Sequence, residues 1–183
     1  MPGGSTITPP VYPGSIGEGD LAFSKLMDAF VADNVYFGHG SYNPTLVPSI
    51  YTTTEAAKTE LTNSFNCLGE LAEKPGKADS KLSKLKTRNY VIPGKCTNTV
   101  ELNIAGLSNN QKTYLESNDF MSKITTIVVA SKDFDRVVIF NGLRWTVDWA
   151  GEADGLFNVT ISSEFSGGTS DKIILLKDIP PRA

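Results

Sequence analysis

The chain has 183 residues, 40% of them hydrophobic and 20% charged, with a formal net charge of −3 at pH 7. This length supports one well-buried core rather than two independent domains, so we expect a single domain over 1–183. The small negative charge gives no general case for nucleic-acid binding. The N-terminus has no basic stretch followed by an apolar one, and no apolar run is long enough to cross a bilayer. We therefore expect neither a signal peptide nor a membrane partner.

The N-terminal part divides into an arm and a mixed segment. Residues 1–19, MPGGSTITPPVYPGSIGEG, are rich in Gly, Pro, Ser and Thr and lack periodicity, which is typical of an extended or disordered arm. Over 20–73 we expect a helix over 21–31 capped by Asp20, a short strand over 34–38 and a second strand over 49–54. From Thr54 onward the spacing favours a helix, although a strand is also compatible with this stretch. The helical spacing is carried by Leu61, Phe65, Leu68 and Leu71.

A basic segment follows over 74–95. It lies between the turn signals Pro75-Gly76 and Pro93-Gly94 and contains seven Lys or Arg residues against the single acid Asp79. The rest of the chain is therefore clearly acidic. We interpret this segment as a long central excursion, partly extended, that leaves the core and returns to it. Its basic side chains could contact either nucleic acid or acidic surfaces of identical subunits.

The segment over 96–183 is expected to form the β-rich core. TNTVELNIAG (97–106) alternates apolar and polar residues, which predicts a strand. Ser108 is placed to cap a helix over 109–117, with Gln111 as its capping-box partner. Further strands are expected over 123–131 and 172–176. Strands around a short helix predict an antiparallel β-sandwich or partly closed barrel, mainly β with one or two short helices.

The stretch Arg136–Phe165 carries the strongest pattern in this core. Asn141-Gly142 lies between two apolar runs and predicts a two-residue hairpin turn that places Phe140 opposite Leu143. A third strand follows after the GEADG turn. Alternation places on one face Val138, Phe140, Leu143, Trp145, Val147 and Trp149, joined by Phe157, Val159 and Ile161 from the third strand.

Residues that could carry chemistry are few. His39 is the only histidine and lies in a Gly-His-Gly loop, so we interpret it as structural. Cys67 and Cys96 are expected to be reduced thiols, with a disulfide between them as the alternative. These three residues match no zinc pattern.

Two further groups have both a structural and a functional interpretation. Asp148, Glu152 and Asp154 could hold Ca²⁺, but turn chemistry is the simpler interpretation. Trp145 and Trp149 could form a stacking platform for carbohydrate, or belong to the core. We expect core residence, and we predict no enzyme activity, no catalytic or metal-binding residue and no cofactor.

The order of elements resembles that of tail-tube-type virion proteins of tailed bacteriophages. The similarity rests on the arm over 1–19, the long excursion near 70–95, and the segments VELNIAGLSNNQKTYLES and RVVIFNGLRWTVDWAGEADGLFNVTISSEFSG. The resemblance implies a virion protein, assembled in the host cytoplasm, whose six-fold rings stack into a tube around passing DNA. Its partners would be identical subunits and other virion proteins. A head–tail connector, a capsid decoration protein and a carbohydrate-binding β-sandwich are the alternatives.

Overall fold

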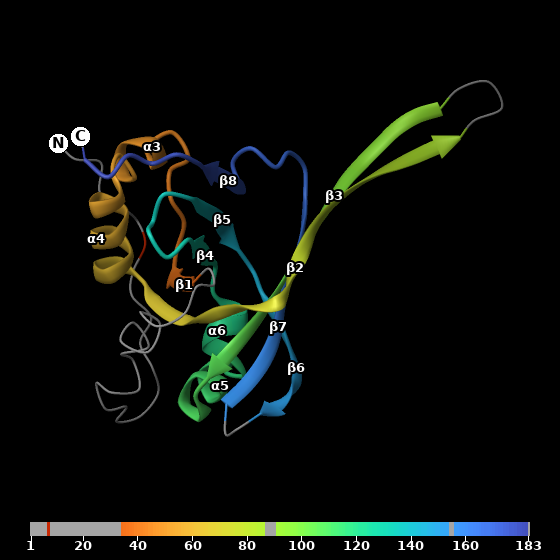
Figure 1. Ribbon diagram of the computed structural model, residues 1–183. Helices are drawn as coiled ribbons and strands as arrows, with labels where there is room; N and C mark the ends of the chain where they lie inside the picture. Colours follow the sequence, from red (N-terminus) through yellow and green to blue (C-terminus); the bar gives the residue numbers. More distant parts are fainter. Residues whose placement is uncertain (1–6, 8–33, 87–90, 154–155, 183) are drawn as a thin grey trace.

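The computed structural model describes residues 7, 34–86, 91–153 and 156–182 (Figure 1). The expected helix over 21–31 lies outside these residues, as does the arm over 1–19 except for Ile7. The described elements are β1 (Asn34–His39), α3 (Val47–Ile50), α4 (Thr54–Ser64), β2 (Asn66–Lys86), β3 (Val91–Leu107), α5 (Asn109–Leu115), α6 (Asn118–Ser122), β4 (Thr125–Ala130), β5 (Val137–Leu143), β6 (Thr146–Ala153), β7 (Leu156–Ser166) and β8 (Ile173–Leu176).

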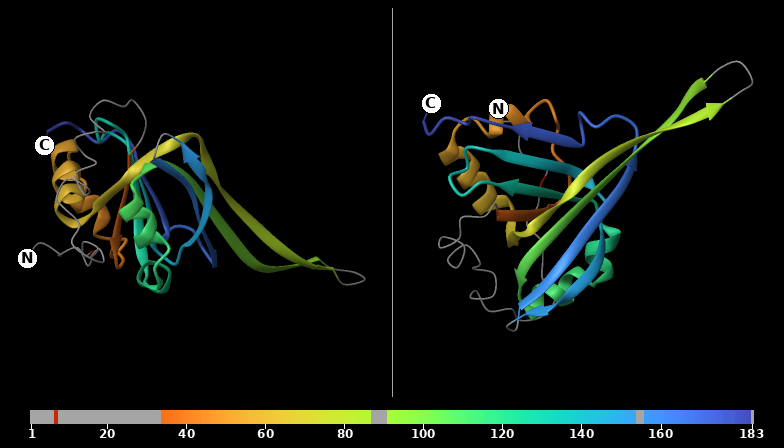
Figure 2. Two further views of the ribbon diagram at one scale, coloured as in Figure 1. Left: turned by 90° about the horizontal axis from the view of Figure 1, so that it is seen from below. Right: turned by 45° about the vertical axis from the view of Figure 1, so that its right-hand side comes forward.

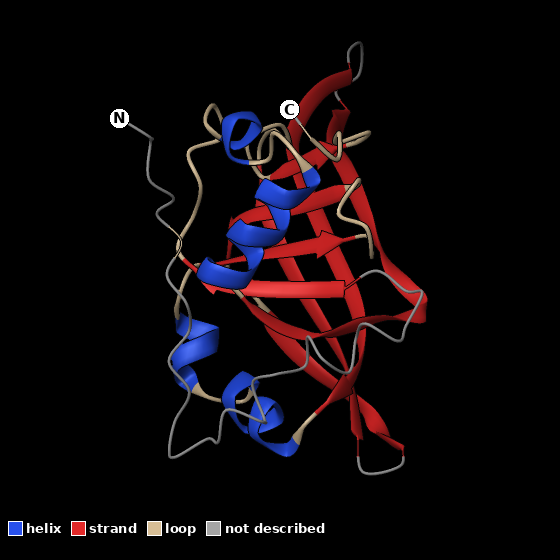
Figure 3. Cartoon of the chain, turned by 60° about the vertical axis from the view of Figure 1, so that its left-hand side comes forward, coloured by secondary structure: helices blue, strands red, loops and turns tan. Residues whose placement is uncertain are grey.

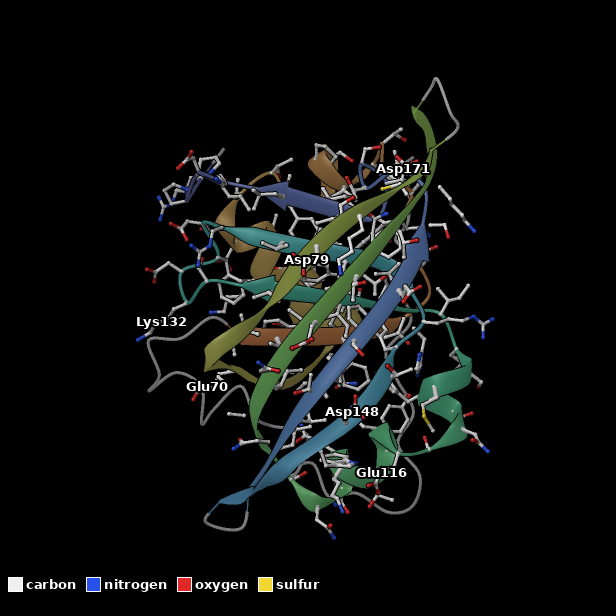
Figure 4. The ribbon with its side chains drawn as sticks, turned by 90° about the vertical axis from the view of Figure 1, so that its right-hand side faces the viewer. Glu70, Asp79, Glu116, Lys132, Asp148 and Asp171 are labelled. Carbon is white, nitrogen blue, oxygen red and sulfur yellow. The ribbon has the colours of Figure 1, made fainter. Side chains whose placement is uncertain are left out.

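All eight described strands belong to one antiparallel sheet with the order β6-β7-β3-β2-β1-β4-β5-β8. The sheet is not closed, and β6 and β8 lie at the two ends of the order of its described strands. Long β2 pairs with both β1 and β3, and the sheet turns there so that β2, β3 and β7 cross over β1, β4 and β5 (Figure 4). The expectation of a mainly β, partly closed antiparallel architecture is confirmed. No helix in the described part of the chain is long and apolar enough to cross a membrane.

The first core fills the space between the two crossing halves of the sheet. Strand alternation directs Val35 and Phe37 of β1 into it, while Tyr36 points the other way. The expected strand over 97–106 contributes Val100, Leu102 and Ile104, as its pattern predicts. Helices α5 and α6 close one end with side chains that are fully buried, Tyr114, Leu115 and Phe120.

The second core lies on the other face of β1, β4 and β5. Helix α4 lies across this face (Figure 3) and buries Ala57 and Leu61 against it. Ile7 also belongs to this core and is 7% exposed. A Cβ on Gly38 would lie 2.5 Å from Cγ2 of Ile7, so a glycine is needed where this residue packs on β1.

The hairpin predicted at Asn141-Gly142 is wrong. Both residues lie within β5, which pairs with β4 and β8, whereas β6 pairs with β7. Gly142 does have the positive φ of 60° that the pattern implies, but Asn141 is buried and hydrogen-bonds to neighbouring segments instead of turning the chain. The predicted apolar face survives this change, because Phe140 and Trp145 still meet in the first core with ring centroids 6.1 Å apart.

Several smaller predictions are also corrected. Residues 49–54 form no strand, because α3, with Pro48 in its first turn, runs to Ile50 and Thr53 caps α4 through the amide of Ala56. The helix expected from Thr54 exists but ends at Ser64, so Leu68 and Leu71 belong to β2. The capping box on Ser108 and Gln111 is confirmed, with α5 ending at Leu115. Four helices are described, counting the unexpected α6, where one or two were predicted.

Candidate functional site

His39 connects three elements at one end of β1. Its Nε2 forms a close hydrogen bond with the hydroxyl group of Tyr114, and its Nδ1 lies 3.1 Å from Oγ1 of Thr125. Partial burial lowers the pKa of His39, and nearby Lys123 lowers it further, while Asp119 opposes the shift. The imidazole thus ties β1 to α5 and β4, which agrees with the structural interpretation.

The two cysteines are both free thiols and lie in different environments. Burial raises the pKa of Cys67 to about 12, which leaves its thiol protonated and unreactive at neutral pH. Cys96 is partly exposed, and its Sγ lies 3.1 Å from Oγ of Ser80. The prediction of two separate thiols agrees with this arrangement.

The two tryptophans do not form a shared stacking platform. Trp145 is 1% exposed, and its Nε1 donates a hydrogen bond of 3.0 Å to the carbonyl of Thr125. Trp149 is partly buried against the first core, and Nζ of Lys112 lies 5.3 Å from its ring centroid. Trp145 is therefore a core residue, as we expected.

The acidic turn gives no described metal site. Asp148 is exposed on β6, and Asp154 lies outside the described residues. Within the described ranges, no group of three His, Cys, Asp or Glu side chains could hold a metal ion.

Of the excursion predicted over 74–95, only the part from residue 82 onward leaves the sheet, and it is a paired β-ribbon and not a loop. Strand β3 pairs with β7 only from Thr97 onward. Beyond that point β2 and β3 pair only with each other, from Leu82 opposite Cys96 to Lys86 opposite Val91. We call residues 82–96 the ribbon; its tip, 87–90, lies outside the described residues. Figures 1 and 2 show the ribbon projecting well beyond the body of the molecule.

The base of the ribbon is fixed by hydrogen bonds to the chain after β7. Asn98 is 1% exposed and donates from Nδ2 to the carbonyl of Gly167 at 2.8 Å. The amide of Gly167 in turn donates to the carbonyl of Cys96 at 3.1 Å. A cavity of about 180 Å³ lies beside this base, lined by Ala78, Asp79, Ser80, Asn98, Thr169 and Ile173. These contacts set the direction in which the ribbon leaves the body.

Charge is divided between the ribbon region and the rest of the chain. Segment 74–95 holds seven basic residues and one acidic residue, a net charge of +6. Because the whole chain carries −3, all other residues together carry −9. Lys81 and Lys95 are exposed at the base of the ribbon. The molecule therefore extends a basic projection from an acidic remainder.

No protein-family model and no curated protein matches this chain. The described residues present a projecting ribbon and two strands, β6 and β8, at the ends of the described strand order. These surfaces, which can contact other proteins, are the candidate functional site.

Proposed function

We propose that this chain is a structural protein of a phage virion that self-assembles into rings, most specifically a tail-tube subunit. The observation that carries the proposal is the ribbon. An isolated two-stranded ribbon is marginally stable in water, and no other described strand pairs with the outer edge of either strand of the ribbon. Packing on a neighbouring subunit would cover these edges and stabilise the projection.

The division of charge supports a head-to-tail arrangement of identical subunits. The basic segment 74–95 of one copy, with a net charge of +6, complements the remainder of −9 on the next. Such a contact joins two different surfaces, and it forms a ring wherever the rotation between neighbours closes. Acidic surface around a channel would also keep DNA phosphates from binding during passage. Other virion proteins would bind the outermost rings.

The proposal is tested by following assembly as the concentration of the full chain rises. Sedimentation velocity and negative-stain microscopy should show rings or stacked tubes. The double substitution Lys81→Glu and Lys95→Glu should weaken assembly, as should raising the ionic strength, because the contact is electrostatic. Lys58→Glu is the matched control, since Lys58 is exposed on α4 and away from the ribbon.

The outcomes of these experiments distinguish the proposed function from its alternatives. A protein that stays monomeric at high concentration contradicts the proposal. Rings that never stack favour a connector or a decoration protein over a tail tube. Glycan binding that changes tryptophan fluorescence would favour the carbohydrate-binding alternative, although Trp145 has almost no exposed surface for it.

A further inference from the structure

A slot opens between the two crossing halves of the sheet. It has a volume of about 350 Å³ and lies between β2 and β3 on one side and β4 and β5 on the other. Its lining is apolar apart from Arg136: Leu71, Leu102, Val129, Val138 and Phe140. Protein interiors are packed to crystal-like density and leave few voids larger than a water molecule. An apolar slot of this size is therefore a place where apolar side chains from elsewhere can be buried.

A pair of exposed apolar side chains lies at the end of α6. Met121 is 40% exposed and Ile124 is 46% exposed, and among the side chains whose exposure the structure describes, Leu175 is the only other large apolar one that is exposed. We call Met121 and Ile124 the knob. The knob is held firmly, because Phe120 anchors α6 in the core and Nη1 of Arg144 donates to the carbonyl of Ser122 at 2.7 Å.

The knob and the slot lie on opposite sides of one molecule. In Figure 4 the α5–α6 helices are at the right, whereas the β4–β5 turn beside the slot, marked by Lys132, is at the left. Arg136 and Val138 follow that turn and line the slot. The knob therefore cannot enter the slot of its own chain, and a second copy is needed to bring the two together.

The charges beside the two surfaces are complementary. Around the knob, Lys123 and Arg144 outnumber Asp119. On the same side of the molecule as the slot are three acidic residues, Glu70, Asp133 and Asp135, against the two basic residues Lys132 and Arg136, and only Arg136 lines the slot itself. A contact that joins two different surfaces of identical subunits is head-to-tail, and contacts of this type can close into a ring.

We propose that the slot receives Met121 and Ile124 from a second copy of this chain. The inference rests on the self-assembly proposed above and identifies a contact within it that is separate from the ribbon. Each copy then uses its knob on one neighbour and its slot on the other. The contact buries apolar side chains, so it should tolerate salt better than the ribbon contact does.

Three full-length variants test the contact. Ile124→Asp disables the knob, and Leu71→Asp disables the slot with a charge. Val138→Phe fills the slot with an apolar group, so it keeps the test valid if a charge at residue 71 disturbs folding. Circular dichroism and thermal melting establish that each variant is folded. Ile124→Val, which keeps an apolar side chain, is the matched control.

Sedimentation velocity should show association weakened by about 30-fold or more for each disabling variant, the size expected of a central apolar anchor. Ile124→Val should associate as the native chain does. The decisive measurement mixes the knob variant with a slot variant at a concentration where each alone is monomeric. One intact knob then meets one intact slot, and the mixture should give a 1:1 dimer and nothing larger.

Three results would overturn the inference in distinguishable ways. Assembly of Ile124→Asp at the native level refutes the knob while leaving the proposed function standing. A mixture that remains monomeric refutes the head-to-tail pairing of knob and slot. A native chain that never self-associates refutes both the contact and the proposed function.

Discussion

The side chain of Asn141 joins three segments that are distant in sequence, and its removal should be costly. Its Oδ1 accepts from the amide of Tyr42 at 2.7 Å, and its Nδ2 donates to the carbonyl of Tyr42 at 3.0 Å. Nδ2 also lies 3.1 Å from the carbonyl of Asp171. Asn141 and Tyr42 are both 3% exposed. The substitution Asn141→Ala therefore leaves two buried backbone groups of Tyr42 without partners.

The size of the effect follows from these two groups. Leaving a buried polar group without a partner costs about 1 to 3 kcal/mol. Asp171 is exposed and its carbonyl can bind water, so we count only the two groups of Tyr42. The free energy of unfolding should fall by about 2 to 5 kcal/mol. For a domain of this length, the midpoint of thermal unfolding should fall by about 5 to 15 °C.

Thermal and urea unfolding followed by circular dichroism measure this loss. Asn43→Ala is the control, because Asn43 is an exposed asparagine whose side-chain oxygen accepts from nearby Thr45, and it should change stability by less than about 0.5 kcal/mol. Asn141→Asp should be at least as harmful as Asn141→Ala, since it replaces the donor with a charge facing two carbonyls. If Asn141→Ala melts within about 2 °C of the native chain, this reasoning is refuted.

Three further predictions concern a glycine, the histidine and the thiols. Gly76→Ala should destabilise the β2–β3 pairing in chemical unfolding, because φ is +114° there and a Cβ would lie 1.9 Å from the carbonyl oxygen of Glu101; an unfolding curve unchanged from the native one would contradict this. His39 has a folded-state pKa below its ordinary 6.5, so the unfolded chain binds more protons and stability should fall as pH drops below 6.5. His39→Gln should reduce that slope, and an identical slope would exclude His39 as its source. A thiol reagent at pH 8 should modify Cys96 in the native protein and reach Cys67 only after denaturation; rapid native reaction of both would contradict the burial of Cys67.

Local patterns in the sequence predicted the elements whose stability is local. The capping box of Ser108 and Gln111 depends on hydrogen bonds within four consecutive residues. The alternation of Val100, Leu102 and Ile104 predicts a strand with one buried face, whichever strands lie beside it. The partly closed antiparallel class followed from the number of such strands. The sequence also indicated that Trp145 belongs to the core, because it shares its face with other large apolar residues.

Partners distant in sequence could not be predicted from local patterns. Asn141-Gly142 matches a hairpin turn, but tertiary hydrogen bonds to Tyr42 and Asp171 hold it inside a strand. The helical spacing that ran on to Leu68 and Leu71 was broken at Phe65, where the chain becomes extended. The slot is lined by residues that only the fold brings together, and only the fold places the knob on the opposite side of the molecule. Neither has a signature along the chain.

The position of β1 within the sheet determines when, during synthesis, the sheet can form on both sides of this strand. Strands β1, β2 and β3 are made early yet lie in the middle of the sheet, while β6 and β8 are made late and lie at the ends of the described strand order. The open side of β1 is covered only when β4 has been synthesised. Until then the nascent chain exposes a central, apolar strand edge, which is the feature that promotes aggregation during synthesis. Productive folding should therefore depend on how quickly residues 125–130 reach β1, and slow pairing of such distant strands should limit the folding rate.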